Sequence, residues 1–113
     1  MDSMTLQRLC RLEDIPDGEA TAVDIALAEG EESVIVLREG DSARAWINVC
    51  PHAGQRLDWS PGKFLVSRGC LICAVHGASF RTSDGHCVGG PCRGDHLRAV
   101  PVTVEDGAVY LAP

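Results

Sequence analysis

The sequence has no long apolar run, although hydrophobic residues make up 45% of its 113 residues. No stretch approaches the roughly 18 to 20 consecutive apolar residues that a membrane-spanning helix needs. Residues 1–6 also lack the basic start and apolar run of a secretory signal, and they contain no twin-arginine pair. These absences predict a soluble protein that works in the cytoplasm.

An excess of basic residues is also absent, because the net charge is -6. Nucleic-acid phosphates attract Lys and Arg and repel carboxylates, so this charge argues against nucleic-acid binding. Residues 1–49 contain eleven Asp and Glu against four Arg, whereas residues 50–113 contain five acids against six Lys and Arg. The acidic first half is interpreted either as a solvated face or as a patch that steers a basic redox partner.

No segment shows the 3.6-residue periodicity of an amphipathic helix for more than about two turns. Short alternating segments predict strands at residues 6–11, 20–26, 33–38, 43–49, 65–67, 71–73, 79–81, 97–104 and 108–111. Turn residues that tolerate positive φ separate several of them, at residues 29–31, 39–41, 83–85 and 105–107. The prediction is an all-β fold: one domain over residues 1–113, built as a small antiparallel sandwich or barrel.

Cysteine and histidine occur together in two short motifs. Cys50 and His52 form a C-x-H pair, and Cys73 and His76 form a C-x-x-H pair, with twenty residues between the two pairs. A 2Fe-2S cluster with mixed ligands needs two thiolates on one iron and two imidazoles on the other. Each motif can supply one of each. The spacing therefore predicts two loops, within residues 50–92, that clamp the two ends of one cluster.

The residues around these motifs resemble the Rieske family of 2Fe-2S proteins. The paired signature reads Cys-Pro-His-Ala-Gly at residues 50–54 and Cys-Ala-Val-His-Gly at residues 73–77. Nearly the whole chain shares the resemblance, through residues 12–18, 84–86 and 104–107 and through a third, proline-containing loop at residues 89–91. In the family this third loop shields the cluster from water. One departure is Ala74, where the family usually places proline.

Two features of high-potential respiratory Rieske proteins are missing from this chain. Those proteins have a disulfide between the cluster loops, with cysteines at the places occupied here by Gln55 and Val75. They also have a Ser and a Tyr that donate hydrogen bonds to the cluster and a ligand thiolate, where this chain has Ala78 and Phe80. Each lost donor removes stabilisation of the reduced, more negative cluster. We therefore expect a midpoint potential toward the low end of the roughly -150 to +300 mV range of Rieske centres.

The resemblance implies an electron carrier without substrate turnover of its own. The chain is similar to the ferredoxin components of aromatic-ring-hydroxylating dioxygenase systems. This similarity implies a monomer that carries single electrons from a flavin-dependent reductase to a terminal oxygenase. An alternative is the small subunit of a multicomponent oxidoreductase, such as an assimilatory nitrite reductase. Co-purification with a larger partner would distinguish this docked subunit from a free carrier.

A third interpretation is a structural zinc module held by four cysteines, Cys70, Cys73, Cys87 and Cys92. This interpretation assigns no role to Cys50, His52 or His76. If the cluster prediction holds, Cys10 and Cys70 are expected to pack as small apolar residues. Cys87 and Cys92 flank the third loop, where a disulfide between them is the alternative, but they are expected to pack too, because a cytoplasmic chain is normally kept reduced.

The two tryptophans have different expected positions. Trp46 alternates with apolar neighbours on a predicted strand and is expected in the core. Trp59 follows the first motif and is expected either to cover the cluster or to contribute to a docking face. His86 and His96 lie outside the motifs and are expected at the surface.

Overall fold

The computed structural model describes residues 7–27, 30–51, 54–74, 77–92 and 94–112. Its strands are β1 (Arg8–Arg11), β2 (Ala20–Leu27), β3 (Gly30–Glu39), β4 (Ser42–Ile47), β5 (Leu65–Ser67), β6 (Cys70–Ile72), β7 (Ser79–Arg81), β8 (Cys87–Gly89), β9 (Ala99–Val100), β10 (Val102–Glu105) and β11 (Ala108–Leu111). A single 3-10 turn, η2 (Leu12–Asp14), follows β1. Every pairing between these strands is antiparallel, which confirms the predicted all-β class. The described part of the chain contains no helix long and apolar enough to span a membrane.

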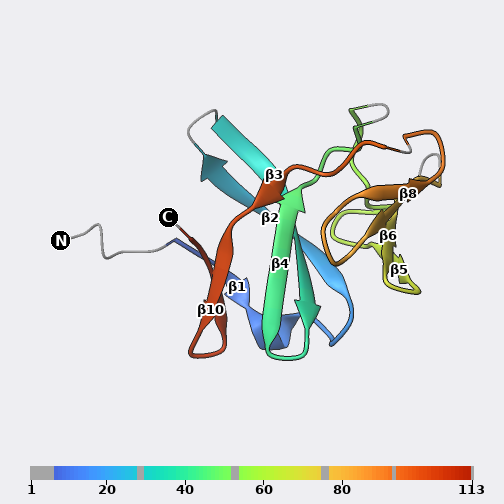
Figure 1. Ribbon diagram of the computed structural model, residues 1–113. Coiled ribbons are helices and arrows are strands. Elements are labelled where there is room, and N and C mark those ends of the chain that lie inside the picture. The colour runs from blue at the N-terminus through green and yellow to red at the C-terminus, as the bar shows by residue number, and fades with distance from the viewer. Residues whose placement is uncertain (1–6, 28–29, 52–53, 75–76, 93, 113) are drawn as a thin grey trace.

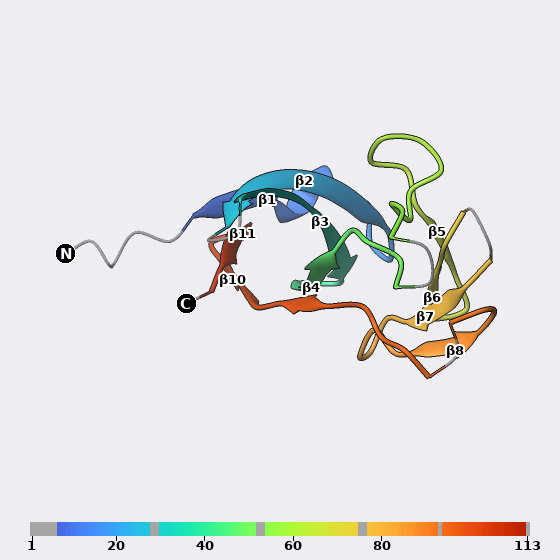
Figure 2. The ribbon, with the colours of Figure 1, turned by 90° about the horizontal axis from the view of Figure 1, so that it is seen from above.

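The strands form three sheets, ordered β1-β11-β10, β2-β3-β4-β9 and β5-β6-β7-β8. Figures 1 and 2 show the first two sheets arranged around a common interior, with the third sheet and its loops at the opposite end of the molecule from β1 and β10. We call residues 8–47 and 99–111, with the first two sheets, the base. Residues 48–98, with the third sheet, form the cap.

Strand β3 faces two cores at once. Val34 and Val36 belong to the core of the base, whereas Ile35 and Leu37, on the opposite face, belong to the core of the cap. All four are buried, because the side chains of a strand alternate between the two faces of its sheet and both faces of β3 are covered. One strand therefore joins the two cores.

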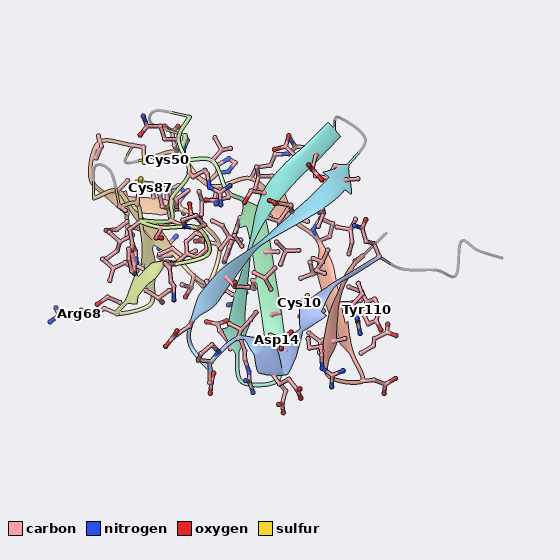
Figure 3. All side chains as sticks on the ribbon, turned by 180° about the vertical axis from the view of Figure 1, so that it is seen from behind. Cys10, Asp14, Cys50, Arg68, Cys87 and Tyr110 are labelled. Atoms are coloured by element: carbon pink, nitrogen blue, oxygen red, sulfur yellow. The ribbon has the colours of Figure 1, made fainter. Side chains whose placement is uncertain are left out.

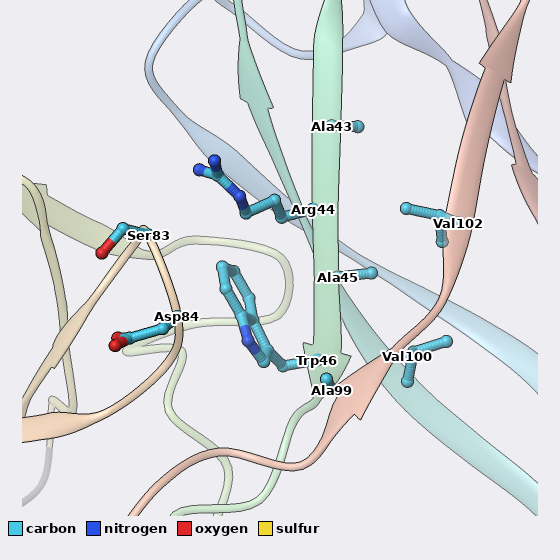
Figure 4. Close-up of a pocket in the computed structure, with 9 residues that line it drawn as sticks. All are labelled: Ala43, Arg44, Ala45, Trp46, Ser83, Asp84, Ala99, Val100 and Val102. Atoms are coloured by element: carbon cyan, nitrogen blue, oxygen red, sulfur yellow. The ribbon is translucent and has the colours of Figure 1, made fainter.

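Trp46 on β4 packs against the cap and so links it to the base. Its side chain is 2% exposed and points from β4 toward the turn that carries Ser83 (Figure 4). At Gly85, where φ is +76°, an added Cβ would lie 2.6 Å from the indole Nε1, so only glycine allows this turn to meet the ring. Beside it, the Arg44 guanidinium donates to the Thr82 carbonyl at 3.1 Å. The predicted core position of Trp46 is confirmed.

The structure corrects three details of the strand prediction. The expected strand at 97–104 is two strands, β9 and β10, because Pro101 lies between them and has no N–H to donate to a ladder. Strand β8 was not expected, since its three residues end in glycine and show no clear alternation. Gly30 begins β3 instead of remaining in a turn. The hairpin turn at 105–107 is confirmed, with positive φ at Asp106 and Gly107.

Candidate metal centre

Both predicted cysteine ligands are buried in the cap core. Cys50 and Cys73 are each 1% exposed, and both belong to the cluster of buried side chains that contains Phe80. Their motif partners, His52 and His76, lie outside the described residues. The structure therefore places both predicted thiolate ligands in one core.

The two loops that begin at these cysteines close with the same hydrogen bonds. The Cys50 N–H donates to the carbonyl five residues later at 2.7 Å, and the Cys50 carbonyl accepts from the glycine four residues later at 2.8 Å. In the second loop the corresponding bonds of Cys73 are 2.8 and 2.9 Å. The two glycines, Gly54 and Gly77, have φ of +69° and +73°, a conformation that favours glycine. The described residues of the two loops thus share the same closing hydrogen bonds and the same glycine conformation.

A buried polar network holds the first loop and links it to the second. The Asn48 side chain is almost fully buried, and its Oδ1 accepts from the Leu57 N–H at 2.9 Å. Its Nδ2 donates to Asp58 at 3.3 Å, and Arg56 donates to the same carboxylate at 2.7 Å. The Leu57 carbonyl in turn accepts from the Ala74 N–H at 3.2 Å. Breaking this network would loosen both ligand loops.

The network also changes the acidity of Asp58. Burial favours the neutral acid, but hydrogen bonds from Arg56, the Gly62 N–H and Asn48 outweigh it and hold the pKa of Asp58 below its ordinary value. The Asp58 side chain is 2% exposed and remains charged, because these donors replace the water it has lost. Neither Asn48 nor Asp58 belongs to a motif in the sequence. The one available signal was a polar residue, Asn48, between apolar neighbours at the end of a strand.

The third loop, at residues 89–91, packs directly on the second ligand loop. Gly90 has φ of +89°, and an added Cβ would lie 2.8 Å from the Cα of Ala78 and 3.2 Å from the Gly77 carbonyl oxygen. The neighbouring atoms are backbone, so they cannot move aside cheaply. Glycine at residue 90 is therefore required for the two loops to meet.

Comparison with known proteins identifies this arrangement. The chain matches the Rieske [2Fe-2S] domain over residues 5–104. The chain belongs to this family. It is 28% identical, over 97% of its own length and 83% of the relative's, to the alkene monooxygenase system ferredoxin component of Xanthobacter autotrophicus strain Py2. Its fold is similar to the ferredoxin of carbazole 1,9a-dioxygenase from Nocardioides aromaticivorans IC177, with a TM-score of 0.74, 28% identity and coverage of 96% and 98% of the two chains. Another relative, the cytochrome b6-f complex iron-sulfur subunit of Chlorobaculum tepidum, is 27% identical, and the match spans 88% of this chain but 49% of that subunit.

The cofactor of this Rieske protein is a 2Fe-2S cluster. The described residues fit such a group, because two buried thiols on matched loops can become thiolates only where a cation compensates their charge. Among the described residues, no three His, Cys, Asp or Glu side chains are arranged to hold a metal ion. All four cysteines of the zinc interpretation are described, so that interpretation is wrong.

Two positions near the predicted ligands carry no hydroxyl. Ala78 and Phe80, the two positions singled out by the family resemblance, are both fully buried in this Rieske domain. Trp59, in contrast, is 63% exposed and lines a surface groove with Pro61 and Phe64. That exposure does not suit a side chain that covers a buried cluster.

Cys87 and Cys92 are free thiols buried in the cap core, as their expected packing role requires. The Cys92 thiol donates to Cys87 Sγ at 3.1 Å. Burial, followed by hydrogen bonds with Cys87 and Cys50, raises the pKa of Cys92 to about 12. Figure 3 shows Cys50 and Cys87 at the same end of the molecule, far from Cys10 in the base.

Proposed function

We propose that this chain is a Rieske-type ferredoxin whose 2Fe-2S cluster is held by Cys50, His52, Cys73 and His76. The observation that supports it most directly is the pair of matched loops, each of which begins with a buried cysteine in the same core. When bound, the cluster supplies one-electron redox chemistry.

The protein residues provide a rigid, dry setting for that electron. Cys50 and Cys73 supply the two thiolates, and His52 and His76 supply neutral imidazoles, so the oxidised centre has no net formal charge. Both cysteine loops are closed by backbone hydrogen bonds, and Asn48 ties the first loop to the strand before it. A loop held at both ends changes little when the charge of the centre changes by one, which favours fast electron transfer.

The proposed route runs from a flavin-dependent reductase to a terminal oxygenase. The alkene monooxygenase ferredoxin component and the carbazole dioxygenase ferredoxin support this route, since both match nearly all of this chain. A solved complex of reduced oxygenase and oxidized ferredoxin in carbazole 1,9a-dioxygenase contains a chain that is 25% identical, with a TM-score of 0.73. The proposal includes a monomeric, cytoplasmic carrier with residues 1–113 as one domain and no substrate turnover of its own.

A second candidate is a docked subunit. A structure named as the small subunit of an NADPH nitrite reductase is 25% identical, has a TM-score of 0.65 and covers 96% of this chain. The whole of that small subunit, 100% of its chain, aligns. The two candidates predict different behaviour on purification: a carrier elutes alone, whereas a subunit elutes with a larger oxidoreductase.

The experiment that tests the proposal follows electrons in and out of the purified protein. NADH and the flavin-dependent reductase of a ring-hydroxylating dioxygenase system should bleach its visible absorption under anaerobic conditions. The oxidised terminal oxygenase of the same system should then restore the absorption. The Cys50→Ser variant should show neither change. A red-brown protein that the reductase cannot reduce, and that elutes only with a larger enzyme, would support the docked subunit instead.

A further inference from the structure

Two cysteines that the cluster does not use lie in contact beside a predicted ligand. Cys87 and Cys92 have a sulfur-to-sulfur distance of 3.1 Å, and a disulfide bond is about 2.05 Å long, so closing the bond requires about 1 Å of movement. Both are free thiols. The other two cysteines outside the motifs, Cys10 and Cys70, lie on separate strands, β1 and β6.

The backbone around the pair holds the two sulfur atoms in place. The Cys87 N–H donates to the Asp95 carbonyl at 2.8 Å, and the Asp95 N–H donates to the Cys92 carbonyl at 2.9 Å. The Cys87 thiol donates to the Gly89 carbonyl at 3.1 Å. Strand β8 and the chain that returns beside it therefore hold the backbone of both residues, which keeps their sulfurs close together.

The pair is buried but lies close to the surface. Val88, between the two cysteines, is 38% exposed, and Pro91 is exposed as well. The short loop between the cysteines is therefore partly exposed to solvent. A small uncharged oxidant can reach such a pair through modest opening of one loop, whereas a protein disulfide cannot.

We propose that Cys87 and Cys92 form a second redox site, a dithiol that hydrogen peroxide converts to a disulfide next to Cys50. The Cys87 sulfur, which accepts the Cys92 hydrogen, attacks a peroxide oxygen, the O–O bond breaks, and a sulfenic acid and one water form, the water taking the Cys87 thiol hydrogen. The other sulfur then attacks the sulfenic sulfur, the S–S bond forms, and the S–O bond breaks with release of a second water. The two thiols lose two electrons in total and peroxide gains two, with both thiol hydrogens ending in water.

Oxidation would also change the environment of the cluster. The Cys92 thiol interacts with Cys50 as well as with Cys87, and it donates its one hydrogen to Cys87. Oxidation removes both thiol hydrogens and draws the two sulfurs together beside Cys50, so the midpoint potential should shift in the disulfide form. This consequence rests on the proposed function, because it requires Cys50 to be a cluster ligand.

Peptide mapping of the purified cluster-containing protein tests the inference. The protein is treated with hydrogen peroxide, quenched with catalase, unfolded in N-ethylmaleimide and digested with trypsin. Cys87 and Cys92 fall on one tryptic peptide, residues 82–93, while Cys50 lies on residues 45–56 and Cys10 on residues 9–11. The expected result is that the 82–93 peptide loses both labels together, is two hydrogens lighter than the dithiol, and regains both labels after dithiothreitol.

Three variants provide the controls. Cys87→Ala and Cys92→Ala should each leave one cysteine in the 82–93 peptide and abolish the internal disulfide. In Cys87→Ala, which retains Cys92 but cannot form the disulfide, peroxide should no longer shift the midpoint potential measured by protein-film voltammetry. Cys10→Ser, in the base, should leave the 82–93 disulfide and the cluster spectrum unchanged.

Several results would overturn the inference. One is that the 82–93 peptide still carries both labels at a peroxide dose that bleaches the cluster. Another is that its disulfide appears only after bleaching. A third is that this peptide becomes cross-linked to residues 45–56. Failure of the proposed function is separately visible, because a protein without iron and visible absorption would fail before peroxide is added. The labels on the 82–93 peptide report the dithiol in either case.

Discussion

The base and the cap are stabilised in different ways. Strands β2 and β3 of the base have 8 and 10 residues, and they pair along 8 consecutive positions around a core of aliphatic side chains. The four strands of the cap have 3 residues each, and four of the twelve buried residues in its core are cysteines. Such short ladders supply few hydrogen bonds and little apolar burial. The comparison indicates that the base can stay folded by itself, whereas the cap depends on what its loops bind.

Replacement of one ligand cysteine should give the largest difference between the two regions. Cys73→Ser is expected to lose iron and visible absorption completely, because a hydroxyl is a poor substitute for a thiolate ligand. The matched control is Cys70→Ser, three residues earlier, which should retain both. Iron analysis and absorption spectra check the pair. A coloured Cys73→Ser protein with full iron content would remove Cys73 from the ligand set.

Removal of the metal should unfold the cap selectively. After chelation of reduced protein, amide hydrogen exchange should become fast in β5 to β8 and stay slow in β2 to β4. Exchange monitored by mass spectrometry, peptide by peptide, measures this difference. Equal loss of protection in both regions would show that the base is not independent of the cluster.

Gly90→Ala should destabilise the cap through a single added methyl group. Its Cβ would lie 2.8 Å from the Ala78 Cα, and overpacking against backbone typically costs roughly 1–3 kcal/mol. Gly94→Ala is the control, since Gly94 also has positive φ, +98°, but has nothing within 4 Å of an added Cβ. The unfolding temperature and the iron content should both fall more in Gly90→Ala than in Gly94→Ala. Equal effects in the two variants would mean that backbone strain, not the loop contact, matters there.

Asp58→Asn should reduce the acid sensitivity of the first ligand loop. The pKa of Asp58 is lower in the folded protein than in the unfolded chain, so its contribution to stability is present above about pH 4 and is lost as the pH falls through the folded value. The variant should be less stable at neutral pH, by roughly 1–3 kcal/mol for a buried charged hydrogen-bond network. Between neutral pH and about pH 3, its free energy of unfolding should then fall less than that of the unmodified protein.

The control for this prediction is Asp84→Asn. Asp84 pairs with Arg81 at the surface, where both side chains are about half exposed, and an exposed ion pair contributes little to stability. Urea unfolding at several pH values compares the two variants. Parallel pH profiles for wild type and Asp58→Asn would contradict the role of the buried carboxylate.

Phe80→Tyr should produce the smallest effect, a shift in potential without a change in fold. Phe80 is fully buried in the same core as Cys50 and Cys73, so the hydroxyl of a tyrosine there would be a polar group close to the cluster ligands. If it donates a hydrogen bond worth roughly 1–2 kcal/mol more to the reduced cluster, the midpoint should rise by about 45–90 mV. Redox titration measures the shift, and Phe64→Tyr, at the edge of the cap core, is the control.

Most of the fold could be predicted from the sequence because its signals are local. Alternating side chains and glycine turns identified nine strands, three of them with the observed bounds unchanged, at β5, β7 and β11. Proline at residue 101 changes the sheet partner of the chain, and a period-2 pattern that continues on either side of it conceals that break. The burial of Ile35 and Leu37 in the cap core follows from tertiary packing, and no local sequence pattern indicates it.

The candidate centre was predictable only in part. Spacing and resemblance indicated Cys50 and Cys73, and the structure places both in one core, while His52 and His76 remain predictions. The network of Asn48 and Asp58 joins side chains ten residues apart, and the contact of Cys87 with Cys92 depends on a turn at residues 92–95. Neither could be deduced from spacing, because side chains meet there through loop geometry.

The most direct test of the ligand assignment is electron-nuclear double resonance on reduced protein labelled with ¹⁵N-histidine. The chain has four histidines, so variants can separate them. The account predicts two nitrogen couplings that survive replacement of His86 and His96 by Asn and disappear when His52 and His76 are replaced. Absence of nitrogen coupling in the unmodified protein, or its persistence without His52 and His76, would contradict the account.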